Sequence, residues 1–182
     1  MGITEKVIEK MYECGASQVA QIDGKDVPYE VSFRDLCVQN SCGRYGKSYG
    51  CPPYIGEAKD MITEAQSYNK AIVYQTIYEL EDSYDIEGML ESGIIHNEIA
   101  KKIKTICKED KVEEFIVMGC GSCDKCSRCA CLDNKPCYFP EEIMASTDSY
   151  CVYVSELAKR CDMKYVNGQN TVTYFGMLLL RG

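Results

Sequence analysis

The stretch NKAIVYQTIYEL, Asn69–Leu80, is rich in β-branched and tyrosine side chains and predicts a β-strand. The segment after it, Ile86–Cys107, has the apolar period of a long helix. The apolar face of that helix would comprise Ile86, Leu90, Ile94, Ile99, Ile103 and Ile106. EFIVM, Glu114–Met118, then predicts a short buried strand. A strand, a helix and a second strand in succession indicate an α/β layered fold.

The segments on either side continue this alternation of helices and strands. Thr4–Cys14 and Glu57–Tyr68 have helical periodicity, and Ser17–Ile22 is a candidate strand. Asp148–Arg160 is expected to be the last helix, and Thr171–Leu180 the last strand.

An Asn-Gly pair lies just before the last predicted strand. Asn167 and Gly168 separate Lys164–Val166 from Thr171–Leu180, which predicts a C-terminal β-hairpin. We therefore expect residues 1–182 to form a single α/β domain. That domain would have a mixed sheet, the C-terminal hairpin and two cysteine-rich loops that bind metal.

Charge and apolar patterning restrict the class of protein. The 182 residues carry a formal net charge of −8, so binding to nucleic acid is not expected. The longest apolar run, Phe175–Leu180, is too short to cross a membrane, and the N-terminus has no apolar signal segment. We therefore expect a cytoplasmic protein, in a reducing compartment where clustered thiols more often bind metal than form disulfides.

Nine of the 13 cysteines lie in two loops, at residues 37–56 and 119–140. The first loop has the spacing Cys37-x4-Cys42-x8-Cys51, followed by two prolines. The second loop holds Cys120, Cys123, Cys126, Cys129, Cys131 and Cys137. A chain of this length can bury enough apolar surface to fold without cross-links, so this density of thiols indicates a bound group.

The second loop contains consecutive C-x2-C steps, which wrap the backbone around a compact centre. Bacterial ferredoxins hold a [4Fe–4S] cluster in this way, with a fourth cysteine from farther along the chain. The predicted ligands here are Cys123, Cys126, Cys129 and Cys137. Pro136 precedes Cys137, whereas proline follows the distant cysteine in ferredoxins, and Cys137 could therefore bind a different centre.

Zinc and disulfides are the alternatives for the second loop. Structural zinc sites favour two C-x2-4-C pairs separated by a longer segment, and an unbroken ladder leaves little room for a tetrahedral site. Disulfide pairing conflicts with the expected reducing compartment. The spacing therefore favours an iron–sulfur cluster over both.

In the first loop, Cys37, Cys42 and Cys51 could hold a second centre. Glycines in this loop would let the backbone approach a bound group closely. The fourth position of such a centre could be filled by Cys120, which follows the predicted strand Glu114–Met118. It could also be left to water or substrate, giving an iron that acts as a Lewis acid. The sequence leaves both alternatives open.

Three segments resemble the DUF2284 family of predicted metal-binding proteins, found mainly in anaerobic bacteria and archaea. They are NSCGRYGKSYGCPPYIG, CDKCSRCACLDNKPCYFPEE and NGQNTVTYFGMLLL. The resemblance implies a small cytoplasmic protein that binds metal or an iron–sulfur cluster. The family pattern falls on Cys37, Cys42, Cys51, Cys123, Cys126, Cys129 and Cys137, and leaves out Cys120 and Cys131.

Taken together, the residues and the resemblance predict one or two [4Fe–4S] clusters. The expected function is electron transfer or redox chemistry in an anaerobic cytoplasm, with a redox partner protein. The first alternative is an enzyme with an open iron on a three-cysteine cluster, and the second is a zinc-binding structural or metal-handling protein. His96, the single histidine, lies within a predicted helix and is expected to be a packing or surface residue.

Overall fold

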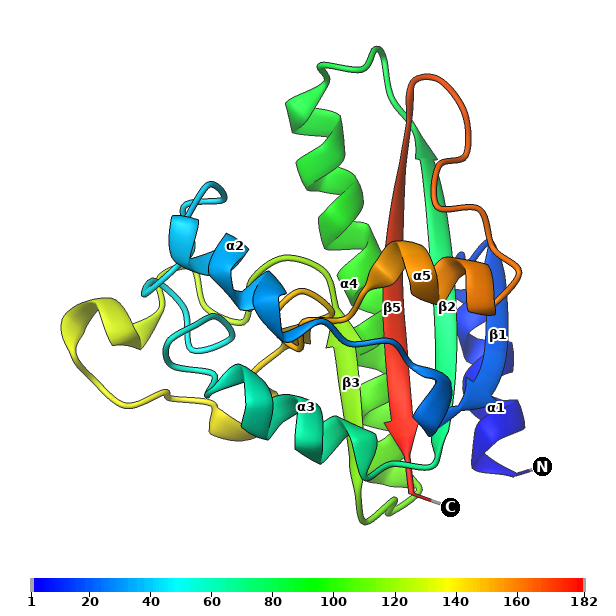
Figure 1. Cartoon of the computed structure of the whole chain (residues 1–182), viewed down its shortest axis with the longest axis horizontal. Coiled ribbons are helices and arrows are strands. Elements are labelled where there is room, and N and C mark those ends of the chain that lie inside the picture. Colours follow the sequence, from blue (N-terminus) through cyan, green and yellow to red (C-terminus); the bar gives the residue numbers. More distant parts are fainter. Residues whose placement is uncertain (1, 182) are drawn as a thin grey trace.

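The computed structural model describes residues 2–181, and the strands of this part form one five-stranded mixed sheet (Figure 1). The strands are β1 (Gln18–Asp23), β2 (Lys70–Glu79), β3 (Phe115–Gly119), β4 (Ala145–Ser146) and β5 (Thr171–Leu180). Their order across the sheet is β1-β2-β5-β3-β4. Only the pair β3–β4 is parallel, and the other neighbours are antiparallel.

Helices cover both faces of this sheet. They are α1 (Ile3–Glu13), α2 (Arg34–Gln39), α3 (Ala58–Gln66), α4 (Ile86–Glu109) and α5 (Val154–Arg160). In Figure 1, α3 and α5 lie in front of the sheet, and α1 and α4 lie behind it. Short 3-10 helices occupy Gly24–Asp26, Val31–Phe33, Ala130–Asp133 and Pro140–Glu142. The α/β layered fold with a mixed sheet is confirmed.

The central strand β2 contributes to two separate apolar cores. Ile72 and Tyr74 belong to the core shared with α1 and α4, whereas Ala71 and Val73 belong to the core shared with α3 and α5. Successive side chains of a strand point to opposite faces. A strand covered on both faces is therefore apolar at successive positions, which explains the sequence of this segment.

The C-terminal hairpin is not formed. The segment Lys164–Val166 is not a strand, and β5 pairs with β2 and β3 instead. The backbone of this segment is bound by a side chain of β2, because Gln75 Nε2 donates to the Lys164 carbonyl oxygen at 2.5 Å. The ring of Tyr165 stacks on Phe175 of β5 at 6.1 Å between centroids. The segment therefore crosses the face of β5 and does not extend its edge.

The apolar stripe predicted on α4 is buried over only half of its length. Ile99, Ile103 and Ile106 are buried against the sheet and α1. Ile86, Leu90 and Ile94 are 69%, 65% and 57% exposed. Figure 1 shows the reason, because the first turns of α4 extend beyond the part of the helix that the sheet covers.

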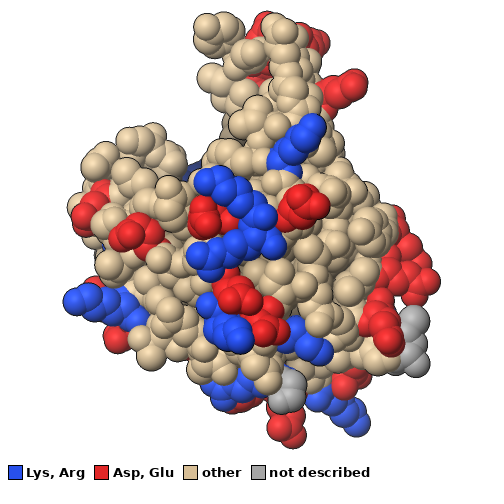
Figure 2. All heavy atoms as spheres, turned by 45° about the vertical axis from the view of Figure 1, so that its right-hand side comes forward, with Lys and Arg blue, Asp and Glu red and all other residues tan. Residues whose placement is uncertain are grey.

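The surface charge and the helices can be compared with the expectations that the chain binds no nucleic acid and crosses no membrane. On the face shown in Figure 2, basic side chains lie among acidic ones, so this face has no extended basic surface. Within residues 2–181, none of the helices combines the length and the apolar character that a bilayer crossing requires.

Candidate metal centre

The two cysteine loops lie next to each other beyond the β3 side of the sheet (Figure 1). The second loop leaves β3 and returns as β4, and the β3–β4 ladder fixes both of its ends. The first loop joins α2 to α3, and its Tyr49 hydroxyl donates to the Lys135 carbonyl oxygen at 2.7 Å. A Cβ placed on Gly50 would be 2.5 Å from the Met144 carbonyl oxygen and 2.9 Å from Cys123 Cβ. The loops are therefore packed at backbone contact.

Four cysteines of the second loop line one cavity, and they are the four whose spacing predicts a cluster. They are Cys123, Cys126, Cys129 and Cys137. Tyr49 of the first loop completes one wall of this cavity. Cys131 is buried and does not line it. The fold thus brings together Cys123 and Cys137, which are fourteen positions apart in the sequence (137 − 123 = 14).

The surroundings of Cys129 stabilise a thiolate. Burial alone would raise the pKa of this thiol, but backbone N–H groups of Cys131, Tyr49 and Ala130 face its sulfur and lower the pKa below its ordinary value. The thiol of Cys131 contributes as a further hydrogen-bond donor to Cys129. Burial and this hydrogen bond raise the pKa of Cys131 itself to about 11, so it is protonated at neutral pH.

The three cysteines of the first loop form a second group. Burial raises the pKa of Cys51 to about 11, and the negative charges of Cys42 and Cys37 add to the effect. Burial likewise raises the pKa of Cys37, and Cys151 and Cys42 contribute to it. The thiols of Cys37 and Cys51 therefore respond to the charge of neighbouring cysteines. A metal that bound here would have to release their protons.

Arg34 supplies positive charge beside this first-loop group. It precedes Cys37 by one helical turn on α2, and its charge opposes the rise in the pKa of Cys37 and of Cys151. The guanidinium donates to the carbonyl oxygens of Gly56 at 2.6 Å and Ser149 at 2.9 Å. Arg34 thus joins the end of the first loop to the segment after β4, and its positive charge favours the deprotonated form of the thiols beside it.

Asp148 supplies negative charge near the first-loop group. The turn that carries it is fixed by reciprocal hydrogen bonds, in which Ser146 N donates to Ser149 Oγ at 3.0 Å and Ser149 N to Ser146 Oγ at 3.1 Å. The carboxylate raises the pKa of both Cys37 and Cys120. Asp148 itself is an exposed residue, yet desolvation of its carboxyl group by the surrounding protein raises its pKa.

Cys120 lies apart from the second-loop cavity. It lines a groove together with Cys42 of the first loop. The Asn97 side chain holds its peptide, accepting from Cys120 N and donating to the Cys120 carbonyl oxygen, both at 2.9 Å. Burial, followed by the charges of Asp148 and Asp124, raises the pKa of Cys120 to about 12. Of the three first-loop cysteines, Cys42 is the one that lines this groove with Cys120.

Arg34, Asp148 and Tyr49 are the site residues that sequence reasoning missed. The spacing of Arg34, three residues before Cys37, was a usable signal because residues three apart share a helix face. No local pattern marks Asp148 or Tyr49, which reach the cysteines only through the docking of the loops. His96 is buried, which agrees with the packing role that was one of the two expected for it. Its Nδ1 shares a hydrogen bond of 2.8 Å with Thr76 Oγ1.

The thiols are chemically available for metal. All 13 cysteines are free, and none is paired in a disulfide within residues 2–181. Over the same residues, no group of three His, Cys, Asp or Glu side chains converges closely enough to hold one metal ion. The four cysteines of the second loop therefore surround a space and do not meet at a point.

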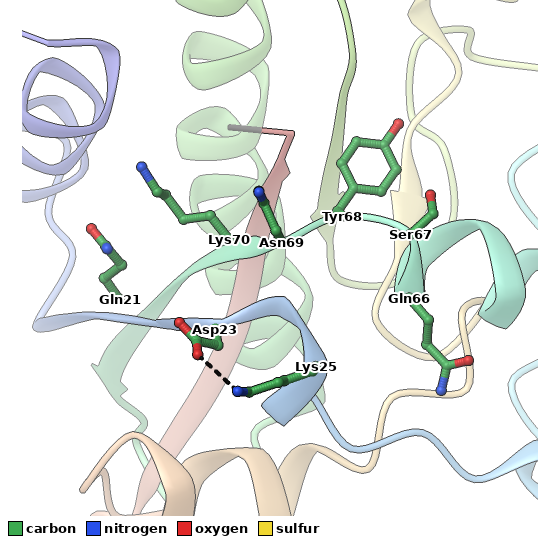
Figure 3. Close-up of a pocket in the computed structure, with 8 residues that line it drawn as sticks. All are labelled: Gln21, Asp23, Lys25, Gln66, Ser67, Tyr68, Asn69 and Lys70. Atoms are coloured by element: carbon green, nitrogen blue, oxygen red, sulfur yellow. Dashed lines mark ion pairs between the residues drawn. The ribbon is translucent and has the colours of Figure 1, made fainter.

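A different hollow, of about 460 Å³, lies at the β1 side of the molecule (Figure 3). Its polar residues include Gln21, Lys70 and the ion pair of Lys25 with Asp23 at 3.4 Å. The side chains in Figure 3 spread apart and do not point toward a common centre, and no cysteine is among them. This hollow therefore offers no thiol to a metal.

Comparison with known proteins identifies the family of this chain. No curated protein and no solved structure matches the chain. Residues 20–180 match the family DUF2284, described as a predicted metal-binding protein, and this range includes both cysteine loops. The chain therefore belongs to DUF2284, a family of predicted metal-binding proteins.

Proposed function

We propose that this chain binds a [4Fe–4S] cluster on Cys123, Cys126, Cys129 and Cys137, and that it acts in electron transfer or redox chemistry. The observation that supports this most directly is that these four thiols line one cavity without converging on one point. A single zinc ion draws each sulfur to about 2.3 Å from one centre. A cluster binds each thiolate at a different iron, and the thiols accordingly stay farther apart.

The environment of Cys129 supports the same proposal. Hydrogen bonds to the sulfur ligands stabilise a cluster and tune its reduction potential. The backbone N–H groups of Cys131, Tyr49 and Ala130 provide such donors at Cys129.

Electron transfer is favoured by the position of the cavity near the surface. Tyr138 and Phe139 line the cavity and are 61% and 45% exposed. A bound [4Fe–4S] cluster supplies one-electron transfer, and one aromatic side chain would separate it from a docked redox partner. We propose that the partner is a second redox protein and that the compartment is a reducing cytoplasm.

A second cluster on Cys37, Cys42 and Cys51 is the next part of the proposal. The charges of Cys42 and Cys37 act on Cys51, and the charge of Cys42 acts on Cys37, which supports one shared site. Cys120 is the proposed fourth ligand, because it lines a groove with Cys42. The same observation favours the alternative function, an enzyme in which one iron is open to substrate, since Cys42 is exposed in that groove.

Metal analysis of anaerobically purified protein tests the proposal. We expect iron and acid-labile sulfide in equal amounts, and an electron paramagnetic resonance signal after reduction. Cys126→Ala should lose the cluster of the second loop and lower the unfolding temperature, because metal binding contributes to folding. Cys14→Ala, at a half-buried cysteine outside both loops, is the matched control and should keep its iron. Zinc at full occupancy without sulfide would refute the proposal and leave the metal-handling alternative.

A further inference from the structure

A groove of about 490 Å³ separates the first half of α4 from the two cysteine loops. Leu90 and Ile94 of α4 form one wall, and Cys42 and Arg44 of the first loop belong to the other. Cys120 and Tyr174 also line it. This volume is in the range of small-molecule binding sites in proteins.

The α4 wall of the groove is apolar and exposed. Leu90 is 65% and Ile94 57% exposed, although both belong to the apolar stripe of the helix. The Tyr174 hydroxyl is already engaged, since it donates to the Met89 carbonyl oxygen at 2.6 Å. Gly93, between these residues, has no side chain to cover the Cys120 sulfur, which lies 3.7 Å from its carbonyl oxygen. An apolar ligand could therefore lie along α4 and reach Cys120.

Arg44 gives the groove its positive charge. Among residues 2–181, the Arg44 guanidinium makes neither a hydrogen bond nor an ion pair. The groove also contains Asp124, but Lys101 pairs with that carboxylate at 2.9 Å. Arg44 is thus available to an anion, and its planar fork suits a carboxylate.

We infer that this groove binds a small organic carboxylate, with the carboxylate at Arg44 and an apolar body on Leu90 and Ile94, beside the thiols of Cys42 and Cys120. The binding depends on the groove alone. A role of the ligand as a substrate at the first-loop centre rests on the alternative in the proposed function, in which one iron is open to substrate.

The apolar wall could instead pair with a second copy of the chain. Two features favour the small ligand. The surface is hollowed and does not form a flat face, and the cation and the two thiols line the same hollow as the apolar side chains. Self-association would also involve Ile86, which is 69% exposed on α4 and does not line the groove.

Octanoate is the probe. Octylamine, which has an eight-carbon hydrocarbon chain and the opposite charge, is its control. Binding is measured by anaerobic isothermal titration calorimetry on the full chain with the metal it retains. Arg44→Gln and Ile94→Glu should each weaken octanoate binding about tenfold or more, through lost charge and lost apolar contact. The matched controls are Lys47→Gln, an exposed cation of the same loop, and Ile86→Glu, an exposed isoleucine of the same helix.

The expected result is octanoate binding by the native chain and by both controls, no octylamine binding, and unchanged iron content in Arg44→Gln. Absent octanoate binding, or equal affinity in Arg44→Gln, would overturn the inference. So would a dimer in sedimentation that both Ile86→Glu and Ile94→Glu dissociate. Octanoate binding to protein that contains no iron would retain the inference and refute only the proposed function.

Discussion

Gly50 is a position at which the two cysteine loops are in close contact, and Gly50→Ala tests whether that contact maintains the site. The added Cβ would lie 2.5 Å from the Met144 carbonyl oxygen, 2.9 Å from Cys123 Cβ and 3.1 Å from Cys123 N. These atoms belong to the backbone or are bonded to it, so the crowding cannot be relieved by rotation of a flexible side chain. The loops must separate by several tenths of an ångström or more, and Cys123 must shift with them.

The cost of overpacking a well-packed site is about 1–3 kcal/mol, and backbone contacts place Gly50→Ala near about 3 kcal/mol. For a chain of this length, that loss corresponds to a decrease of about 6–12 °C in unfolding temperature. Because Cys123 is a proposed ligand, metal content should decrease as well. The assay is thermal unfolding together with iron and sulfide analysis of anaerobically purified protein.

Gly46→Ala in the same loop is the matched control. Gly46 has a φ of 68° and no atom within 4 Å of an added Cβ, so its substitution strains the backbone without crowding the second loop. It should cost about 1 kcal/mol and leave the metal content unchanged. If Gly50→Ala kept native metal content and unfolded at the temperature of the native chain, the docking of the loops would not support the site.

Two further predictions concern Asn97 and His96, successive residues of α4. Asn97→Ala leaves the N–H and the carbonyl oxygen of Cys120 without partners and should cost about 2–4 kcal/mol, whereas Glu98→Ala, at an exposed ion pair with Lys101, should cost under about 1 kcal/mol. Equal unfolding temperatures for the two variants would contradict this role of Asn97. Burial lowers the pKa of His96 to about 4, from an ordinary value of 6.5, so the unfolded chain takes up the proton first as the pH falls. The native chain should therefore lose up to about 3 kcal/mol between pH 6.5 and pH 4, and His96→Gln should lose less, in denaturant unfolding measured against pH.

The sequence predicts the sheet and the ligand-rich loops because both have local signals. Asn69–Leu80 is apolar at successive positions since β2 is covered on both faces, and the C-x2-C ladder is a property of adjacent residues. The apolar period of α4 also predicts a helix correctly. It cannot show where the sheet beneath that helix ends, and the predicted apolar face therefore includes Leu90 and Ile94, which are exposed.

The failed hairpin and the missed site residues have a different cause. Asn167 and Gly168 are suitable turn residues, but the side chain of Gln75, far away in the sequence, binds the segment before them. Asp148 and Tyr49 likewise reach the cysteines only after β3 and β4 have paired and the two loops have docked. Such contacts depend on tertiary arrangement, and a single sequence gives no local measure of it.

The docking of the loops also implies that the two proposed centres depend on each other. Tyr49 lies in the first loop, yet it lines the cavity of the second loop and its backbone N–H faces Cys129. Cys120 belongs to the second loop, yet it lies with Cys42 of the first. Each centre therefore takes part of its surroundings from the loop that carries the other. Binding of metal at one loop orders residues that the other centre needs, so the two centres should fill together and be lost together.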